Sequence, residues 1–252
     1  MGRRAITAIL LASALLMPQA LKADDTGLII EAGVEKKFDK RTSIAFDTEF
    51  RSRNDFRTAD RISLGISGER RLTPWLRLSA GYQLLIDNNI QKLTYNTDGS
   101  YNNWRPSYWA TRHRINAALT ASYKIGRVNL SLRERWRYTY RPEHNTRRYD
   151  FDNNWWEDKT VKEKSTHILR SRLKASWDIP ASKFEPWASF EVFNALSNSF
   201  TLDKMRYSAG VDYQFRKRHT FGIFYRYQDI RNNDSDDEVD SHHIGASYKF
   251  KF

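Results

Sequence analysis

The sequence predicts an all-β protein: one antiparallel transmembrane β-barrel over residues 24–252, preceded by a cleaved signal peptide over residues 1–23. Three observations lead to this prediction. The chain opens with a basic and then apolar segment, apolar and polar residues alternate strictly through the rest of it, and short turns alternate with long polar loops. Together they indicate export, followed by insertion into a membrane as strands.

The first residues have the parts of a secretory signal peptide. A short basic segment precedes an apolar run over residues 5–17, and Pro18 ends that run. We expect cleavage after Ala23, with Ala20 as the alternative site; a buried N-terminal helix is the other interpretation. Cleavage removes three basic residues and lowers the formal charge from +12 to +9. Although a pI near 9.8 is typical of nucleic-acid-binding proteins, an exported chain is not expected to bind nucleic acid.

The composition excludes several classes of protein. With 29% charged residues, the chain cannot supply a bundle of transmembrane helices, each of which needs about 20 successive apolar residues. The 8 Trp, 13 Tyr and 14 Phe, against 11 Gly, argue against low-complexity disorder. The absence of Cys excludes disulfide bonds, thiolate zinc sites and a cysteine nucleophile.

Beyond residue 24, apolar and polar residues alternate with a period of two. Residues 128–140 place Val, Leu, Trp and Tyr on one face and Asn, Ser, Arg and Thr on the other, and residues 205–215 and 244–252 repeat the pattern. Because successive side chains of a strand point to opposite faces, such alternation is typical of a strand with one apolar face.

We count eleven runs of this kind. Most are far longer than the strands of soluble proteins, which average about 5–6 residues, and they match the roughly 9–11 residues that cross a bilayer. Since bacterial single-chain barrels have an even number of strands, we expect ten strands if the first run does not cross fully, or twelve if one is missed. The runs are 27–38, 42–53, 60–70, 75–87, 109–124, 127–141, 164–178, 186–195, 204–216, 220–230 and 242–252.

The connections between the runs alternate in length, as in outer-membrane barrels. Short turns at 39–41, 72–74, 125–126 and 216–218 interleave with long polar loops at 88–108, 142–163, 196–203 and 231–241. Aromatic residues near the strand ends suit an interfacial girdle: Trp136, Tyr138, Tyr140, Trp177, Trp187, Tyr213, Phe215, Tyr225, Tyr227, Phe250 and Phe252. A soluble two-sheet sandwich also alternates, but needs neither such long strands nor such aromatic ends. Glu134 falls on the lipid-facing side, and we expect a bulge near Arg133 to re-aim it.

The last residues, Tyr248, Phe250 and Phe252, alternate with Lys and end the chain. With the signal peptide and the strands, they resemble Gram-negative outer-membrane β-barrel proteins, in which such an ending is the recognition signal for barrel assembly. The segments 133–137, 170–172 and 187–193 further resemble a family of these barrels known only as a domain of unknown function. The resemblance covers residues 24–252. It implies a location in the outer membrane, with lipid, lipopolysaccharide and the barrel-assembly machinery as partners, and it supplies no reaction.

If the apolar set of each strand faces lipid, the other set faces the lumen. Basic residues gather on three adjoining runs and acidic residues on four others, so that in a closed barrel a basic wall would face an acidic wall. The basic wall comprises Arg112, Arg114, Arg133, Arg135, Arg137, Arg170, Arg172 and Lys174. The acidic wall comprises Glu31, Glu35, Asp47, Glu49, Glu191 and Asp212.

Such a lumen predicts a narrow, porin-like channel for small anionic or sugar-like solutes, because arginines attract anions and a transverse field orients dipoles. The alternative is a non-conducting barrel with a structural, adhesive or accessory role. Side chains fill barrels of about eight strands, and buried charges must pair. The sequence does not indicate which applies, nor the oligomeric state.

We predict no enzyme, no cofactor and no metal site. A lipid-modifying enzyme is the further alternative, since His113 and His167 face outward with Ser165 and Ser171, but the sequences around them match no outer-membrane hydrolase or acyltransferase motif. The acidic run at 234–240 lacks the Gly and the spaced Glu of a calcium loop, and His242 and His243 alone do not complete a metal site.

The two longest loops, 88–108 and 142–163, mix aromatic residues with amides. Aromatic rings stack on sugars and amides hydrogen-bond to them, so contact with surface glycans is a further hypothesis. The aromatic and amide residues are Asn88, Asn89, Tyr95, Asn96, Tyr101, Asn102, Asn103, Trp104, Tyr149, Phe151, Trp155 and Trp156.

Overall fold

The computed structural model describes residues 25–197, 199–216, 218–232 and 239–252. The predicted signal peptide and most of the acidic run at 234–240 lie outside these residues. In the described part of the chain, no helix is long and apolar enough to cross a membrane.

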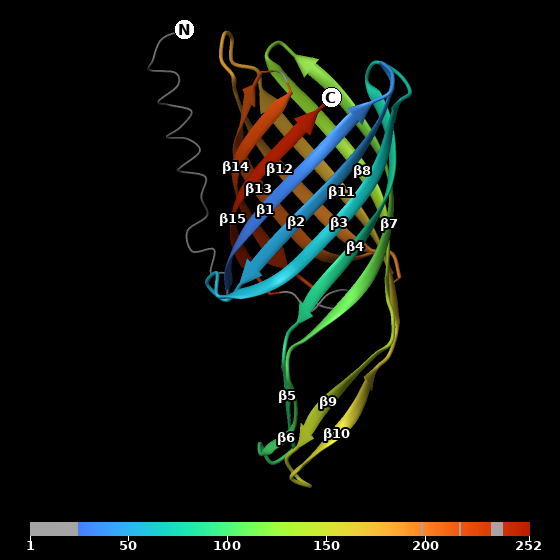
Figure 1. Cartoon of the computed structure of the whole chain (residues 1–252), viewed down its shortest axis with the longest axis vertical. Helices are drawn as coiled ribbons and strands as arrows, with labels where there is room; N and C mark the ends of the chain where they lie inside the picture. The colour runs from blue at the N-terminus through green and yellow to red at the C-terminus, as the bar shows by residue number, and fades with distance from the viewer. Residues whose placement is uncertain (1–24, 198, 217, 233–238) are drawn as a thin grey trace.

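Eleven strands close into one barrel, in the order β1-β15-β14-β13-β12-β11-β8-β7-β4-β3-β2 (Figure 1). Each corresponds to one of the alternating runs, which confirms the all-β barrel. The strands are β1 (Asp25–Lys37), β2 (Thr42–Arg53), β3 (Thr58–Arg71), β4 (Leu76–Asn89), β7 (Tyr108–Ile125), β8 (Val128–Arg141), β11 (Lys164–Trp177), β12 (Phe184–Ala195), β13 (Thr201–Phe215), β14 (His219–Ile230) and β15 (Ser241–Lys251).

The expected count of ten or twelve strands is wrong. An odd number places the first and last strands parallel at the closure, and β1 pairs with β15 in parallel from Asp25↔Ser241 to Glu35↔Lys251. The other edge of β1 pairs antiparallel with β2. Because β1 has hydrogen-bonded neighbours on both edges, the barrel closes without a twelfth strand.

The two rims of the barrel differ. At the rim where β15 ends, short turns join the strands; at the opposite rim, where β1 begins, the long connections leave (Figure 1). In the turn between β1 and β2, the carboxylate of Asp39 accepts hydrogen bonds from the backbone amides of Arg41 and Thr42, the latter at 2.7 Å. These two hydrogen bonds hold the pKa of Asp39 below its usual value, and the bond from Arg41 has the larger effect. We call the two ends the short-turn rim and the long-loop rim.

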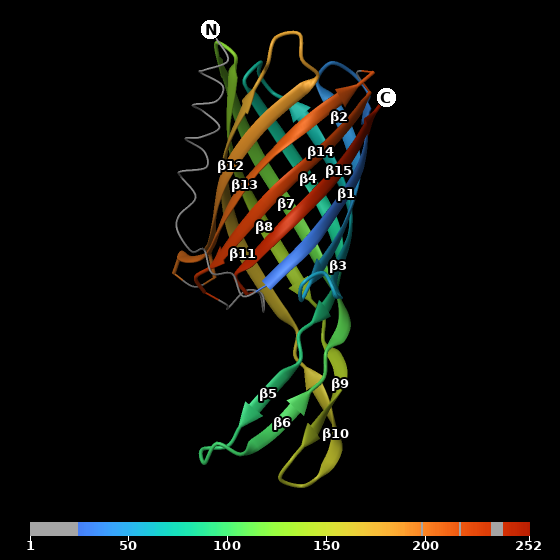
Figure 2. The ribbon, with the colours of Figure 1, turned by 90° about the vertical axis from the view of Figure 1, so that its left-hand side faces the viewer.

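The two longest loops are not irregular. Residues 88–108 and 142–163 contain four short strands that form a separate sheet in the order β10-β9-β6-β5. This loop sheet extends from the long-loop rim along the long axis of the molecule (Figures 1 and 2). Its strands are β5 (Lys92–Tyr95), β6 (Tyr101–Arg105), β9 (His144–Asp150) and β10 (Trp155–Val161).

Large apolar side chains cover the outer wall, among them Ile30, Phe46, Ile66 and Ile223, each more than 45% exposed. The bulge expected near Arg133 is absent, because β8 pairs in continuous register with both of its neighbours. Glu134 therefore stays on the outer face.

Glu134 accepts a hydrogen bond of 2.6 Å from the hydroxyl of Ser171, directly opposite on β11.

The assignment of Trp187 to the lipid-facing aromatic girdle is also wrong. Its ring faces the lumen, with the Lys174 ammonium 4.4 Å from its centroid, because Trp187 shares the face of the buried Glu191.

Candidate functional site

Five arginines gather in the middle of the lumen. On the paired strands β8 and β11, Arg135 lies directly opposite Arg170, and Arg133 lies opposite Arg172. Arg206 joins them from β13 and is buried. Like charges directly opposite one another destabilise a sheet, so this arrangement needs negative charge nearby. We call these five residues the arginine cluster.

Glu191, on β12 between β11 and β13, supplies a carboxylate at the centre of the cluster. It pairs in register with Arg172 on one side and Arg206 on the other. Its oxygens lie 2.6 Å from Arg170 Nη2 and 3.5 Å from Arg206 Nη1. Arg172 Nε and Arg133 Nη2 are at 3.9 and 4.0 Å. Glu191 thus lies within the basic wall and not in the facing wall where we expected it.

Arg135 has neither a hydrogen bond nor an ion pair to any residue that the structure describes. The buried Nε atoms of Arg133, Arg135, Arg170 and Arg172 likewise lack hydrogen-bond partners. One carboxylate is therefore shared by four arginines of the cluster, and Arg135 has no ion pair among the described residues. The cluster carries more positive charge than its protein neighbours neutralise.

Two adjoining cavities in the lumen are lined by this cluster. One, of about 470 Å³, is bordered by four of the wall arginines together with Arg206. The other, of about 500 Å³, continues to the short-turn rim, where Asp39 and Arg71 line it. Both are bordered by Arg133, Arg135 and Arg172. Arginines of the cluster thus border open space that begins at the short-turn rim.

The carboxylates of β1 and β2 lie across the barrel, since five strand steps separate β1 from β8 and β2 from β11. Glu31 is 3.3 Å from Arg226 on β14 and Glu35 is 2.8 Å from Lys249 on β15, so the two strands that follow β1 around the barrel supply their cations.

The other predicted acidic residues occupy three positions. Asp47 lines both cavities, and Glu49 lies 2.9 Å from Arg51. Asp212, on β13, lines the cavity of about 470 Å³, which we call the inner cavity. The acids opposite the cluster are thus largely matched locally.

Towards the long-loop rim the lumen is closed. Four inward-facing apolar side chains, Ile29, Leu85, Ile168 and Phe193, are 0–1% exposed near the long-loop ends of their strands. Four cations surround the ring of Phe193, with centroid distances of 5.0 Å for Arg170 and Arg206, 5.2 Å for Lys204 and 5.8 Å for Arg137. Favourable cation–π contact accounts for charged groups packed around an apolar ring. We call the four apolar residues Ile29, Leu85, Ile168 and Phe193 the closing layer.

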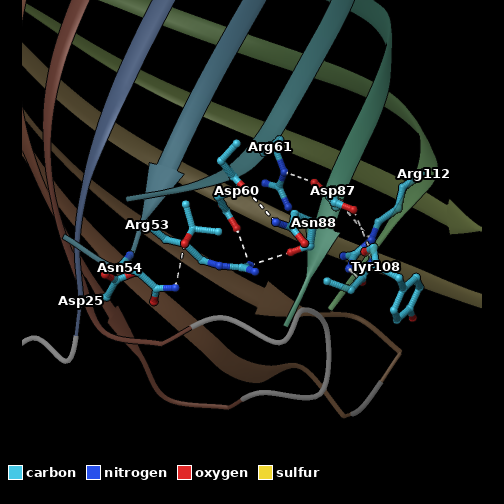
Figure 3. A network of polar contacts seen from close by, with 12 residues as sticks. Asp25, Arg53, Asn54, Asp60, Arg61, Asp87, Asn88, Tyr108 and Arg112 are labelled. Atoms are coloured by element: carbon cyan, nitrogen blue, oxygen red, sulfur yellow. Dashed lines mark hydrogen bonds and ion pairs between the residues drawn. The ribbon is translucent and has the colours of Figure 1, made fainter. Parts of the chain in front are cut away.

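The closing layer continues into a polar network at the base of the loop sheet (Figure 3). Asp87 bridges two buried arginines: it forms an ion pair with Arg61, and Arg112 Nε lies 3.0 Å from its Oδ2. Beside it, Arg53 Nη1 donates to Asp60 at 3.0 Å and to the carbonyl of Asn88 at 2.6 Å (Figure 3). Each of these three arginines thus has a carboxylate beside it.

The remaining basic residues of the predicted wall lie at different levels. Arg112, Arg114 and Arg137 are buried near the long-loop rim, whereas Lys174 lies towards the short-turn rim beside Trp187. Arg114 Nε donates to the hydroxyl of Thr139 at 3.2 Å. Only four of the eight, Arg133, Arg135, Arg170 and Arg172, therefore meet in one place.

Sequence reasoning missed several residues of the site. Arg206 and Arg226 carry the same alternation signal as the chosen arginines, since they fall in the polar sets of β13 and β14. Asp87 and Arg61 also lie on inward faces. Phe193 could not have been found by that signal, because an apolar residue on an inward face looks like a residue of the lipid-facing set.

The serines and histidines of the outer wall do not form a catalytic arrangement in the described structure. Ser165 Oγ lies 3.0 Å from the hydroxyl of Tyr138, and Ser171 donates to Glu134. His113 Nδ1 contacts Tyr82 at 2.7 Å. A serine nucleophile requires a base within hydrogen-bond reach, and these bonds join neither Ser165 nor Ser171 to a histidine ring. Nor do those residues include a group of three or more potential metal ligands.

Comparisons with known proteins agree with this fold. The family model described as "Protein of unknown function (DUF2490)" matches residues 28–239. The β domain of the Bordetella autotransporter BrkA is similar in structure, with a TM-score of 0.54, 14% identity, and coverage of 84% of this chain and 82% of that one. The NanC porin gives a TM-score of 0.48 at 12% identity, covering 90% and 99%. No curated protein matches the chain in sequence. The fold is that of outer-membrane β-barrels.

Proposed function

We propose that this chain, which belongs to the DUF2490 family of proteins of unknown function, is a narrow outer-membrane channel with a preference for small anionic or acidic sugar-like solutes. The observation that carries the proposal is the arginine cluster: four of its five arginines share one buried carboxylate, and all five border a lumen cavity that adjoins the one at the short-turn rim. Excess cationic charge in a confined lumen raises the local concentration of anions.

The chemistry of the cluster also suggests which anions it favours. Guanidinium groups bind carboxylates and phosphates through parallel hydrogen bonds. Arg133 and Arg172 face each other, and so do Arg135 and Arg170 two residues further along. Side chains two residues apart on one face are separated by about 6.8 Å. The wall therefore offers two successive levels of cationic donors, along which an acidic solute could pass from one level to the next.

The location proposed with this function is the bacterial outer membrane, after removal of residues 1–23. The short-turn rim would face the periplasm, as in barrels with short periplasmic turns and long outer loops. Tyr248, Phe250 and Phe252 would present the barrel-assembly signal, and lipid and lipopolysaccharide would surround the wall. We assign no reaction, metal or cofactor, since the outer-wall serines bond to Tyr138 and Glu134 instead of a histidine.

Reversal potentials test this proposal. The purified, refolded mature chain is inserted in a planar bilayer with a KCl gradient across it. We expect small, stable conductance steps. The sign of the reversal potential should show that chloride crosses more readily than potassium. Replacing Arg135 and Arg172 by Ser should move the potential towards zero. Stable channels that prefer cations would contradict the proposal.

A non-conducting barrel is the second candidate, and the closing layer favours it. Phe193 is 0% exposed. A third cavity, of about 540 Å³, lies at the long-loop rim beside Arg53 and Asp60, and we call it the outer cavity. It shares no lining residue with the inner cavity, which is the one of about 470 Å³ beside the arginine cluster. Arg206, which lines the inner cavity, donates at 2.7 Å to Gln228, which lines the outer one. If folded wild-type protein is silent, Phe193→Ala should open conduction. Phe190→Ala on the lipid-facing side of the same strand is the control.

A further inference from the structure

The loop sheet has one aromatic face. Pairing places Leu93 opposite Trp104, Tyr95 opposite Tyr101, and Trp104 opposite Tyr149, with Trp156 following on β10. Positions directly opposite, and those two residues apart on regular strands, share a face. The aromatic face therefore consists of Leu93, Tyr95, Tyr101, Trp104, Tyr149, Phe151 and Trp156. The other face carries Arg148 paired with Glu157, beside Trp155.

The rings of this face form one continuous row. Neighbouring centroids are 5.5 Å apart for Tyr95 and Tyr101, 5.3 Å for Tyr101 and Phe151, and 5.0 Å for Phe151 and Tyr149. The row continues from Tyr149 through Trp156 to Trp104 with spacings of 5.5 and 5.7 Å. Six aromatic rings from two loops, separated by more than 30 residues of chain, thus meet in one row.

Much of this face is open to solvent. Tyr95 is 59% exposed, Tyr101 54% and Trp156 43%. Both views show the sheet extending away from the rim along the barrel axis, clear of the lipid-facing wall (Figures 1 and 2). A contiguous exposed apolar patch on a folded protein marks an interaction site. The row serves neither the lumen nor the membrane contact of the barrel.

The sheet is held firmly at its base, which makes the face a prepared surface. β4 and β7, which flank the first hairpin, are joined by Asn89, whose side-chain amide donates to the carbonyl of Tyr108 at 3.3 Å. Tyr108 stacks on His144 at 4.9 Å and receives the guanidinium of Arg105 at 5.1 Å. A rigid row of rings loses little conformational entropy when a ligand stacks on it.

The charges around the row select among ligands. Asp98, Asp150 and Asp152 surround its tip, and hydrogen bonds from the side chain and then the backbone of Asn153 hold the pKa of Asp150 below its usual value. The guanidinium of Arg147 over Trp156 lies 4.0 Å from Asp158. Ionised carboxylates at the tip repel anionic polymers, whereas a neutral sugar can stack its C–H face on the rings and hydrogen-bond to amides such as Asn96.

We propose that the aromatic face of the loop sheet binds a neutral polysaccharide chain. The exposed rings of the row, Tyr95, Tyr101 and Trp156, would stack on sugar units of the chain. The edges of the row carry the hydrogen-bonding groups that sugar hydroxyls require, including Asn154 beside the Tyr149 hydroxyl and Gln91, 3.2 Å from the indole nitrogen of Trp104. This binding site is separate from the lumen, so it stands independently of the channel.

Affinity electrophoresis tests this proposal. The refolded full-length mature chain is run on native gels cast with soluble α-glucan, β-glucan, mannan or galactan, and on a gel with polygalacturonate. We expect at least one neutral polysaccharide to retard the protein. Trp156→Ala and Tyr101→Ala should each weaken that retardation by roughly tenfold in affinity. The polyanion gel reports any contribution from the basic lumen.

Trp155→Ala is the matched control, because Trp155 is 59% exposed but lies on the opposite face of the same strand. It should leave retardation unchanged. The proposal is overturned if no neutral polysaccharide retards the wild type, or if Trp155→Ala weakens binding as much as Trp156→Ala. It is also overturned if Trp156→Ala leaves polysaccharide binding intact and abolishes only the binding of a protein or of lipid vesicles, measured in parallel. Trp156→Ala should leave the reversal potential unchanged, and the Arg135 and Arg172 variants should leave glycan binding unchanged, so the two proposals fail separately.

Discussion

The two halves of the lumen use arginine differently. Near the long-loop rim, Arg61 and Arg112 share the carboxylate of Asp87, and these three residues line none of the three cavities described above. In the middle of the barrel, four arginines share the carboxylate of Glu191, and Arg135 beside them has no partner among the described residues. Two arginines share one carboxylate where the lumen is closed, whereas five arginines gather around one carboxylate where it is open.

This difference indicates what each half does. A buried charge without a partner is strongly destabilising, so each arginine of a closed layer needs a carboxylate or another favourable group beside it. A cavity connected to solvent can hold arginines in excess, because water and mobile anions compensate for them. Excess charge beside open space is therefore a sign of ligand contact, and matched charge without space is a sign of structural support.

The largest effect is expected at Asp87. Asp87→Leu leaves Arg61 and Arg112 buried without their shared carboxylate, and should lower the free energy of unfolding by about 3–5 kcal/mol. Urea titration in lipid vesicles, followed by tryptophan fluorescence, measures this. Glu69→Gln is the control: its partner Arg77 is at 3.4 Å and both are well exposed, so the loss should stay under about 1 kcal/mol. Equal losses would contradict a structural role for the buried carboxylate of Asp87.

Glu191→Gln should show the next largest effect, and salt should modify it. Without Glu191, the cluster repels itself, and we expect a loss of about 2 kcal/mol at low ionic strength. Phosphate can enter the cavity and replace the carboxylate, so added phosphate should restore much of the stability. The Asp87→Leu loss should respond less to phosphate, because Asp87 and its two arginines are buried and line none of the three cavities. A Glu191→Gln loss that phosphate leaves unchanged would argue against an accessible cluster.

Arg135→Gln should have a smaller effect of opposite sign. It removes a charge that lies directly opposite Arg170 and has no partner in the described structure, so stability should rise by up to about 1 kcal/mol. Arg112→Gln is the matched control and should destabilise, because Arg112 lies 3.0 Å from Asp87. The same urea titration reports both signs. Destabilisation by Arg135→Gln would show that the residue supports the barrel instead of facing a ligand.

The smallest effect is expected on the outer wall. Glu134→Leu removes a charge from the lipid-facing side and should raise stability by about 1 kcal/mol or less, since Ser171 already satisfies one carboxylate oxygen. Ser171→Ala should lower stability, because it leaves the carboxylate without that donor. Unfolding midpoints in vesicles of one lipid composition compare the two variants. A loss from Glu134→Leu would indicate that this carboxylate has a further partner.

Most of the barrel could be predicted from sequence because one rule governs it. Each strand has lipid on one side, so apolar residues must occupy alternate positions, and the eleven runs end within a few residues of the observed strands. The strand count failed because we applied an evenness rule in place of the pattern itself. Parallel pairing of β1 with β15 leaves no mark on either strand.

The loop sheet and the exact partners within the lumen could not be predicted, for a different reason. β5 and β6 are only 4 and 5 residues long, and β6 pairs with β9 across more than 40 residues of sequence. Alternation shows which way Glu191 faces, but its partners depend on strand order and register. Arg206, which lies opposite it, comes from β13.

The reversal potential in a KCl gradient, measured for the wild type and for the Arg135→Ser, Arg172→Ser double variant, tests the central claim most directly. The account predicts anion preference that falls in the double variant while the protein stays folded, because these arginines line both cavities. An unchanged reversal potential in a conducting double variant would contradict the claim that the arginine cluster determines what enters the lumen.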